Sequence, residues 1–426
     1  MFFSGSASGY QQFVEYLADV VAGQGLMRPP SIETAGSGYA VGDTLTMVGG
    51  TADAPGAAQL YVTSVDTNGG VVATHVINAG TYSTPPAGNM TSTGGSGTGA
   101  VFSGTFGTSN WEVLDEELPG GGHRELYLRS VLGSGSTVTN VYGGMRTYET
   151  GAARNIELAG FTGWTDGLAW ASQPGISPGR SDSNGGAFMP LRDSSLNYYV
   201  SVQPHRIAGA IDMPGDYTAT FYLGLVASNR PMFQPPGLSM EINAYPMYVA
   251  GCSSQFDETS TSTNYIGSVA NPIAVDELSD GPGIRRNASG AWVTVKNTYP
   301  NFGSKFNGEI RAVTPCGMAR EDPLLPEDTI STRDSTSWWA IADQSGVMSP
   351  SWDLVPTGGH TAVFQTTVAD QDDPFVNTGE LSGVYWCSGN RLPQPPFYSQ
   401  TGDALMLFIR GGNIQEDFTW MALEVS

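Results

Sequence analysis

The stretch Gly36–Gly50, GSGYAVGDTLTMVGG, surrounds one tyrosine with glycines. A second stretch of the same kind, INAGTYSTPP, follows at Ile77–Pro86, and GGSGTGAVF comes after it at Gly94–Phe102. Glycine supplies the positive φ angles that tight corners need. A tyrosine gives each small layer a large side chain to bury. We therefore predict a small β module rather than an active-site loop.

Two copies of one pattern can be aligned within Ser31–Thr108. The matched positions, first copy against second, are Ile32 with Ile77, Ala35 with Ala79, Gly36 with Gly80, and Tyr39 with Tyr82. Downstream, GAAQLYVTSV at Gly56–Val65 resembles GTGAVFSGTF at Gly97–Phe106. Two copies are too few for a solenoid. Residues 31–108 are therefore predicted to be a compact inserted β module with two pseudo-repeats.

A hairpin is predicted between the two copies. The segment VDTNGGVVATHV, Val65–Val76, has two strand-like halves around Asn68-Gly69. Asn-Gly flanked by such halves is the strongest short hairpin signal, because both residues accept positive φ.

One helix is predicted, near the beginning of the sequence. In SASGYQQFVEYLADVVAGQG, one helical face carries Phe13, Leu17, Val20 and Val21. Ser6 or Ser8 is the expected cap, and Gly23 or Gly25 the expected end. Residues 1–30 are thus predicted to form an N-terminal helix that packs on the body of its own chain, or on a neighbour.

Residues 109–426 are predicted to form the main body, which is rich in strands. The expected strands and hairpins are Glu125–Val131, Thr139–Glu149, Arg206–Val226 with its turn at Met213–Asp216, Ala404–Ile409 and Phe418–Val425. Pro231–Pro246 and Ser253–Thr263 are expected to be surface loops. The predicted fold class is mainly β: an N-terminal helix, a small Gly-rich β module and a larger antiparallel β-sandwich-like body.

Composition excludes several kinds of partner. The chain of 426 residues has 40 acidic and 18 basic residues, a net charge of -22. Such a chain cannot neutralise many phosphates, so we expect neither nucleic acid nor an anionic membrane surface as a partner. Apolar runs stay below the ~18 residues of a membrane helix.

The place of folding follows from cysteine usage and the start of the sequence. Cys252, Cys316 and Cys387 lie far apart and form no CxxC pair, so a disulfide framework is not expected. The opening MFFSGSASGY lacks the basic flank and apolar core of a signal peptide. We expect a soluble protein made in the cytosol.

Catalytic and metal-binding motifs are not found. The four histidines, His75, His123, His205 and His360, have no partner at zinc-ligand spacing. GxSxG, HExxH and P-loop motifs do not occur. We therefore predict that the chain is not an enzyme, and we expect no catalytic, cofactor-binding or metal-binding residues.

Four acidic or Asp-rich segments are interpreted as solvated loops. They are Asp115–Glu117, Asp182–Gly186, Glu321–Asp328 and Asp370–Asp373. Paired carboxylates could instead serve glycoside hydrolysis, and clustered ones could hold calcium.

Aromatic residues supply the candidates for interaction. Several tryptophans lie in Gly-, Ser- and Asp-rich contexts, where a sugar-stacking lectin would also keep them; the alternative is that they cover the core or line a subunit interface. The candidate interaction residues are Tyr39, Tyr82, Trp164, Trp170, Trp338 and Trp339.

The order of several segments resembles a family of tailed-bacteriophage virion proteins, described as structural or tail proteins. The sequence runs SGSASGYQQFVEYLADVVAGQG, WEVLDEE, ELYLRSV, VYGGMRTYETGAARNIELAGFTGW, FMPLRDSSLNYYVSVQPHRIAGAI, YTATFYLGLV and YPMYVAGCSS. The resemblance covers about residues 1–30 and 109–252. The interrupting segment Ser31–Thr108 resembles a β module that recurs in phage tail, fibre and baseplate proteins.

These resemblances imply a structural role without catalytic residues. The implied protein is a homo-oligomeric virion component, located in the tail, baseplate or neck and assembled in the host cytoplasm with other virion proteins. Two alternatives stay open: an appendage that binds a receptor or host surface glycan, and a capsid or collar decoration protein. A glycan depolymerase is a third, enzymatic alternative. The resemblance does not give the position on the virion, the copy number or the symmetry.

Overall fold

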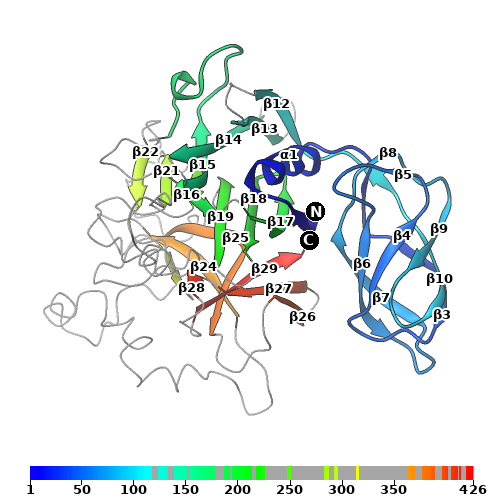
Figure 1. Ribbon diagram of the computed structural model, residues 1–426. Helices are drawn as coiled ribbons and strands as arrows, with labels where there is room; N and C mark the ends of the chain where they lie inside the picture. Colours follow the sequence, from blue (N-terminus) through cyan, green and yellow to red (C-terminus); the bar gives the residue numbers. More distant parts are fainter. Residues whose placement is uncertain are drawn as a thin grey trace, which may run out of the picture.

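The computed structural model describes residues 1–117, 123–132, 139–150, 153–177, 187–191, 194–213, 217–225, 247–250, 283–286, 292–295, 313–315, 363–369, 377–388, 396–401, 404–410, 412–413 and 419–425. These residues are mainly β, in antiparallel sheets, with a single α-helix (Figure 1). The predicted fold class is confirmed.

The body consists of three sheets. The central sheet has the order β1-β17-β18-β19-β20-β21-β22, with β28 paired to β19. Its strands are β1 (Phe2–Ala7), β17 (Leu196–Gln203), β18 (Arg206–Asp212), β19 (Tyr217–Leu225), β20 (Met247–Ala250), β21 (Gly283–Arg286), β22 (Trp292–Val295) and β28 (Gly412–Asn413).

The other two sheets of the body cover the central one. The first has the order β12-β13-β14-β15-β16 and the second β23-β24-β25-β29-β27-β26. The strands of the first are β12 (Trp111–Glu117), β13 (Glu125–Leu132), β14 (Thr139–Thr150), β15 (Ala153–Phe161) and β16 (Ala187–Leu191). Those of the second are β23 (Val313–Pro315), β24 (Val363–Ala369), β25 (Asn377–Ser388), β26 (Phe397–Thr401), β27 (Ala404–Arg410) and β29 (Thr419–Val425).

The central sheet is buried on both faces. In β18, Ile207 and Ile211 join the core shared with the five-stranded sheet and α1. The intervening Ala208 and Ala210 join the core shared with β25, β27 and β29. A strand covered on both sides is apolar at consecutive positions rather than at alternate ones, as RIAGAI is here.

Helix α1 (Tyr10–Val21) packs on its own chain, as expected by default. The predicted apolar face is buried, and Tyr10, Val14 and Ala18 are buried with it. The expected serine caps are wrong: the residue before the helix is Gly9, which has no side-chain cap, and the Ser8 amide donates instead to Gln12 Oε1 at 2.7 Å.

The prediction that residues 1–30 are a helix alone is incomplete, because strand β1 precedes α1. It pairs with β17 from Phe2↔Ser201 to Ala7↔Leu196. Phe2 belongs to one core and Phe3 to the other. Adjacent phenylalanines do not show the alternation by which a half-buried strand is recognised in a sequence.

The glycine-rich module contains a six-stranded sheet of order β3-β10-β9-β4-β6-β7. Its strands are β3 (Ser31–Ser37), β4 (Thr44–Val48), β6 (Gln59–Val65), β7 (Val71–Asn78), β9 (Asn89–Thr93) and β10 (Thr98–Ser103); the short strands β5 (Thr51–Ala52) and β8 (Tyr82–Thr84) form a separate pair. The sheet curves so that its edge strands β3 and β7 contact each other. It encloses a core cluster that includes Leu45, Leu60 and Phe102.

The chain enters and leaves the module at a two-stranded neck. Strand β2 (Leu26–Met27) pairs with β11 (Phe106–Gly107), in the register Met27↔Phe106 and Leu26↔Gly107. Around this pair, the Arg28 amide donates to Thr105 O at 2.9 Å and the Arg28 side chain to Thr108 O at 2.8 Å. The two ends of the insertion therefore lie side by side.

Most predicted strands and hairpins are found. β13, β14, β27 and β29 match the expected strands, and β18 and β19 form the expected hairpin. At the predicted Asn68-Gly69 turn, Gly69 has φ +74 and its amide donates to Asp66 O at 3.0 Å. Pro214–Asp216 of the expected hairpin turn and the two expected loops, Pro231–Pro246 and Ser253–Thr263, lie outside the described residues.

Candidate interaction site

The two matched tyrosines of the module occupy equivalent positions and make the same hydrogen bond. Tyr39 Oη accepts from the Ala100 amide at 3.3 Å, and Tyr82 Oη accepts from the Ala58 amide at 2.9 Å. Both rings are buried, with exposed fractions of 5% and 3%. Tyr39 of the first repeat thus bonds to Ala100 of the second, and Tyr82 of the second repeat bonds to Ala58 of the first. They are core residues of the module and offer no surface for a partner.

The matched positions require glycine for two reasons: neighbouring backbone atoms lie too close for a side chain, and the φ angle is positive. Gly36 has φ +65, and a Cβ added to it would lie 2.6 Å from the Ala100 nitrogen. Gly80 has φ +63, and its added Cβ would lie 2.5 Å from the Ala58 nitrogen. Both positions therefore exclude a side chain, for the same two reasons.

The strand order shows the pseudo-twofold relation directly. The first copy supplies β3, β4 and β6, and the second supplies β7, β9 and β10. In the order β3-β10-β9-β4-β6-β7, each strand of the first copy and its counterpart in the second lie at the same distance from opposite ends of the sheet. Both β3 and β7 carry a bulge. In β3, Val101 opposes Thr34. Phe102 opposes Ile32, so Glu33 is the extra residue.

The bulge of β7 lies at the equivalent place. Gln59 opposes Asn78. Leu60 opposes Val76, so Ile77 is the extra residue. Ile77 is therefore the counterpart of Glu33.

The alignment made from the sequence is wrong by one residue at two places. Ile32 corresponds to Val76, not to Ile77, because each occupies the position next to its bulge. Ala58 corresponds to Ala100, not to Gly99 as in the sequence alignment, because Ala58 and Ala100 each donate an amide hydrogen bond to a matched tyrosine. The pairs Ala35 with Ala79, Gly36 with Gly80 and Tyr39 with Tyr82 hold.

The module is docked on the body through the outer edge of β7. The Ala79 amide donates to Phe2 O at 2.9 Å, and Ser4 Oγ donates to Ile77 O at 2.9 Å. The Asn78 side chain donates to Ser4 O at 3.1 Å. One backbone bond and two side-chain bonds thus hold the end of β7 beside β1, with the two segments running in opposite directions. We call the residues Ile77–Ala79 the docking edge.

Apolar side chains complete the docking edge on one face. Ile77 is 4% exposed and belongs to the core cluster of Phe2 and Leu423. Next to it, the rings of Tyr61 and Tyr398 meet with centroids 5.2 Å apart, across module and body. Burial raises the pKa of both tyrosines above its usual range, so both hydroxyls stay neutral at physiological pH.

A cavity of about 510 Å³ lies where the end of α1 faces the module, with Asp19, Asp53 and Ser83 in its lining. Burial, together with the negative charges of Glu15, Glu116 and Asp53, raises the pKa of Asp19 to about 6. Ser83 Oγ donates to Asp53 Oδ1 at 3.1 Å. The cavity is acidic, and none of the four histidines is in its lining.

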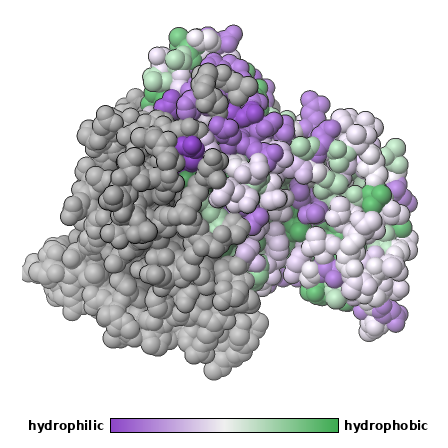
Figure 2. Space-filling model, in the orientation of Figure 1, coloured by the Kyte–Doolittle hydropathy of each residue, from purple (hydrophilic) through white to green (hydrophobic). Residues whose placement is uncertain are grey.

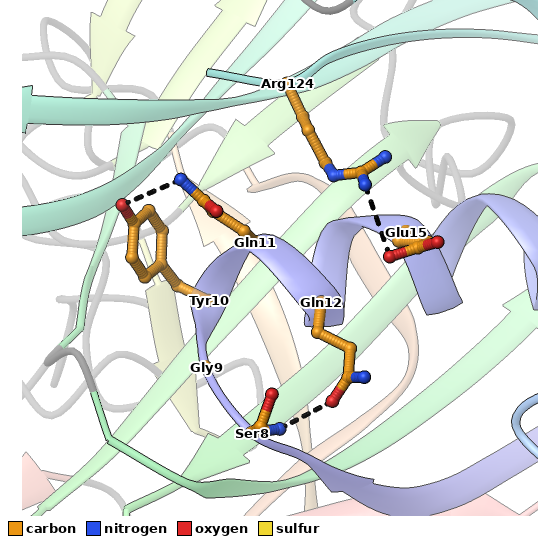
Figure 3. A pocket seen from close by; sticks show the side chains of 7 residues that line it. All are labelled: Ser8, Gly9, Tyr10, Gln11, Gln12, Glu15 and Arg124. Carbon is orange, nitrogen blue, oxygen red and sulfur yellow. Dashed lines mark hydrogen bonds and ion pairs between the residues drawn. The ribbon is translucent and has the colours of Figure 1, made fainter. Parts of the chain in front are cut away.

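A smaller pocket of about 240 Å³ lies at the start of α1 (Figure 3). Its polar side chains bond mostly to one another: Gln11 Nε2 donates to Tyr10 Oη at 3.3 Å, and Arg124 pairs with Glu15 at 3.3 Å. Arg124 also pairs with Glu116 at 2.7 Å. Figure 2 shows hydrophilic residues gathered over this part of the molecule, around α1, β12 and β13. The pocket contains no nucleophile paired with a base.

The segment Asp115–Glu117 was expected to be a solvated loop, and this is wrong. It forms the end of β12, where Asp115 opposes Tyr127 and Glu117 opposes Glu125. Glu112 of the same strand pairs with Arg129. Cross-strand cations and hydrogen bonds let this edge strand carry many acids. The other three acidic segments lie outside the described residues.

Trp170 is buried and is not available for sugar stacking. It is 2% exposed, on the 3-10 turn Trp170–Ser172, and its ring lies 5.4 Å from Phe161 and 5.5 Å from Tyr127. The Arg146 guanidinium lies 5.1 Å from the ring centroid and pairs with Glu157. This is a core role, which was one of the two interpretations.

Of the other three candidate tryptophans, one lies in the described part of the chain and two lie outside it. Trp164 is half-buried and packs against the cluster of Trp170. Trp338 and Trp339 lie outside the described residues. Of the four candidates that the structure describes, Tyr39 and Tyr82 lie in the module core, and Trp164 lies against the cluster of Trp170.

Sequence reasoning missed the docking edge. Ile77 entered the sequence analysis only as the match of Ile32, and β1 was not foreseen, so their contact could not be predicted. With the bulges matched, the two copies are IETAG and VINAG, of equal length. Matching them over that full length would have placed Ile77 opposite Glu33.

Among the residues that the structure describes, no group of three or more His, Cys, Asp or Glu side chains is placed to hold a metal ion. Within the same residues, no helix has the length and apolar character to cross a membrane. No protein-family model matches the chain, and no curated protein is significantly similar to it.

Proposed function

We propose that the chain is a structural component of a tailed-bacteriophage virion, associated with the tail, baseplate or neck. In this role it acts by oligomeric assembly with copies of itself and with other virion proteins, without chemistry of its own. It is made in the host cytoplasm and ends in the particle.

The observation that carries the proposal is the relation between the module and the body. A β module with its own core interrupts the chain at a two-stranded neck and is fixed to the body by the docking edge. The two resemblances to phage proteins divide the sequence at the same boundaries: one covers Ser31–Thr108, and the other covers the residues on either side of it. An independent β unit attached in this way suits a protein that contributes surfaces to an assembly.

The charge of the chain is consistent with such a part. A net charge of -22 keeps a β-rich protein soluble until it is incorporated. Assembly then has to bury its surfaces against neighbours of suitable shape and charge.

Electron microscopy of intact virions tests the proposal, with an antibody against residues 31–108 as the label. Label at the distal tail is expected for a baseplate part, and label at the head–tail junction for a neck part. Label over the capsid would replace both with a decoration role. Particles without any label would contradict the structural proposal.

A glycan-binding appendage is the second candidate, and it depends on tryptophans outside the described residues. Glycan-array binding by the purified chain that disappears in Trp338→Ala or Trp339→Ala would favour it. Retained binding in both variants, or none in the native chain, would count against it.

A further inference from the structure

The module has two equivalent edges, and only one of them holds the body. On β7 the positions are Ile77, Asn78 and Ala79; the equivalent positions on β3 are Glu33, Thr34 and Ala35. We call Glu33–Ala35 the free edge. Strand β3 is the last strand of its sheet, as β7 is at the other end.

The free edge is open to solvent. Glu33 and Thr34 are exposed and Ala35 is half-exposed, whereas Ile77, Asn78 and Ala79 are all buried. Further along β3 the edge is closed by the β6–β7 turn, where the Tyr39 amide donates to Gly69 O at 2.9 Å. The counterparts of Ile77 and Asn78 on β3, Glu33 and Thr34, are therefore exposed, whereas Ala35 lies beside Gly70 of that turn.

The chemical difference between the two edges lies at the bulge. Ile77 is apolar and shares a core cluster with Phe2 of β1, and the Ser4 hydroxyl donates to the Ile77 carbonyl oxygen, so Ser4 lies beside Ile77. Glu33 puts a carboxylate at that place. A strand identical to β1 would have to remove this charge from water without a partner, which is unfavourable. A strand with a cation opposite Glu33 would pair with it across the edge.

We propose that the free edge binds an extended segment of a partner protein that carries a lysine or arginine at the position of Ser4 in β1 and no other charged residue. The module then holds β1 of the body at the docking edge by an apolar contact, and the partner's strand at the free edge by an ion pair with Glu33. Addition of a strand to an exposed edge is an established mode of peptide recognition. The proposal concerns any partner and does not depend on a place in a virion.

Hydrogen exchange of the full chain with two capped peptides tests the proposal. The peptides are Phe-Phe-Lys-Gly-Ser-Ala and Phe-Phe-Glu-Gly-Ser-Ala, which copy β1 except at the position of Ser4. The lysine peptide is expected to slow exchange within residues 31–37. We expect it to bind roughly threefold to tenfold more tightly than the glutamate peptide, the range given by one attractive and one repulsive surface pair.

The variant Glu33→Lys is expected to reverse this preference. Exchange within residues 76–79 serves as the internal control and should stay slow throughout, because β1 already occupies that edge. A preference for lysine that persists in Glu33→Lys would overturn the proposal. So would the absence of protection by either peptide at saturating concentration, which would make Glu33 a guard that keeps the edge unpaired.

Discussion

Tyr82 and Tyr39 illustrate how much one hydroxyl contributes inside a small module. Each accepts a hydrogen bond from a buried amide, at 2.9 Å for Tyr82 and 3.3 Å for Tyr39. Their spacing from glycine in the sequence was enough to predict burial in the module core. The donors, Ala58 and Ala100, could not be predicted because they belong to the opposite repeat.

Tyr82→Phe should destabilise the module by about 1–3 kcal/mol, because it leaves the Ala58 amide buried without an acceptor. Tyr39→Phe is the matched variant and should cost less, since its bond is longer. Urea unfolding followed by a probe in the module measures both. Equal costs, or a larger cost for Tyr39→Phe, would contradict the prediction.

Asp19 should make stability depend on pH. Its pKa of about 6 in the folded chain lies above the ordinary value of 3.8, so the folded state binds more protons between these values. Stability is then highest below pH 3.8 as far as this group is concerned, and it falls as the pH rises through 6.

The variant Asp19→Asn should remove that decrease. Unfolding free energies at pH 4.5 and pH 7.5 measure it, with Asp66→Asn as a control at an exposed carboxylate of the module. If both variants change the pH dependence to the same extent, Asp19 is not its source.

At the level of elements, local chemistry predicted the structure well where the turn residues determine it. The Asn68-Gly69 turn, the hairpin of β18 and β19, and α1 all follow from short-range signals. β1 was missed because its side chains enter two cores, so no alternation marks it. The alignment of repeats failed by one residue because it matched Ile32 to Ile77 by residue type, whereas the structural counterpart of Ile32 is Val76.

Ile77→Glu should release the module from the body. The substitution puts a carboxylate among the apolar side chains around Phe2 and Leu423, which is unfavourable. The module's own core is expected to stay folded, because Ile77 faces outward from it. Small-angle scattering should show a more extended particle, and proteolysis should cut more readily at the neck.

Val72→Glu is the control for this change. Val72 lies on the same strand but is 57% exposed, so the same substitution should leave scattering and proteolysis as they are. An unchanged profile for Ile77→Glu would show that the docking edge does not hold the module in place.

At the level of the whole molecule, the neck predicts that the module can be removed. The sheet of the module extends from Ser31 to Ser103, and the pair Met27↔Phe106 joins the two ends of the insertion beneath it. Replacing residues 31–104 by a short Gly/Ser linker should leave a body that unfolds cooperatively, though less stably, because Ile77 and Ala79 belong to its cores. Circular dichroism and thermal unfolding of the shortened chain measure this. A body that does not fold would refute the separation into module and body.

The pairing of β1 with β17 also determines when each part can form. The module needs only residues that lie close together in the sequence, whereas β1 waits for β17, and Ser201 in turn waits for Glu424, 223 residues later. During synthesis, an emerging chain is therefore expected to complete the module first and to hold β1 against Ile77 before the rest of its sheet exists. On the ribosome, the folded module is then expected to cover the edge of β1 that faces Ile77–Ala79 until the remainder of the body is made.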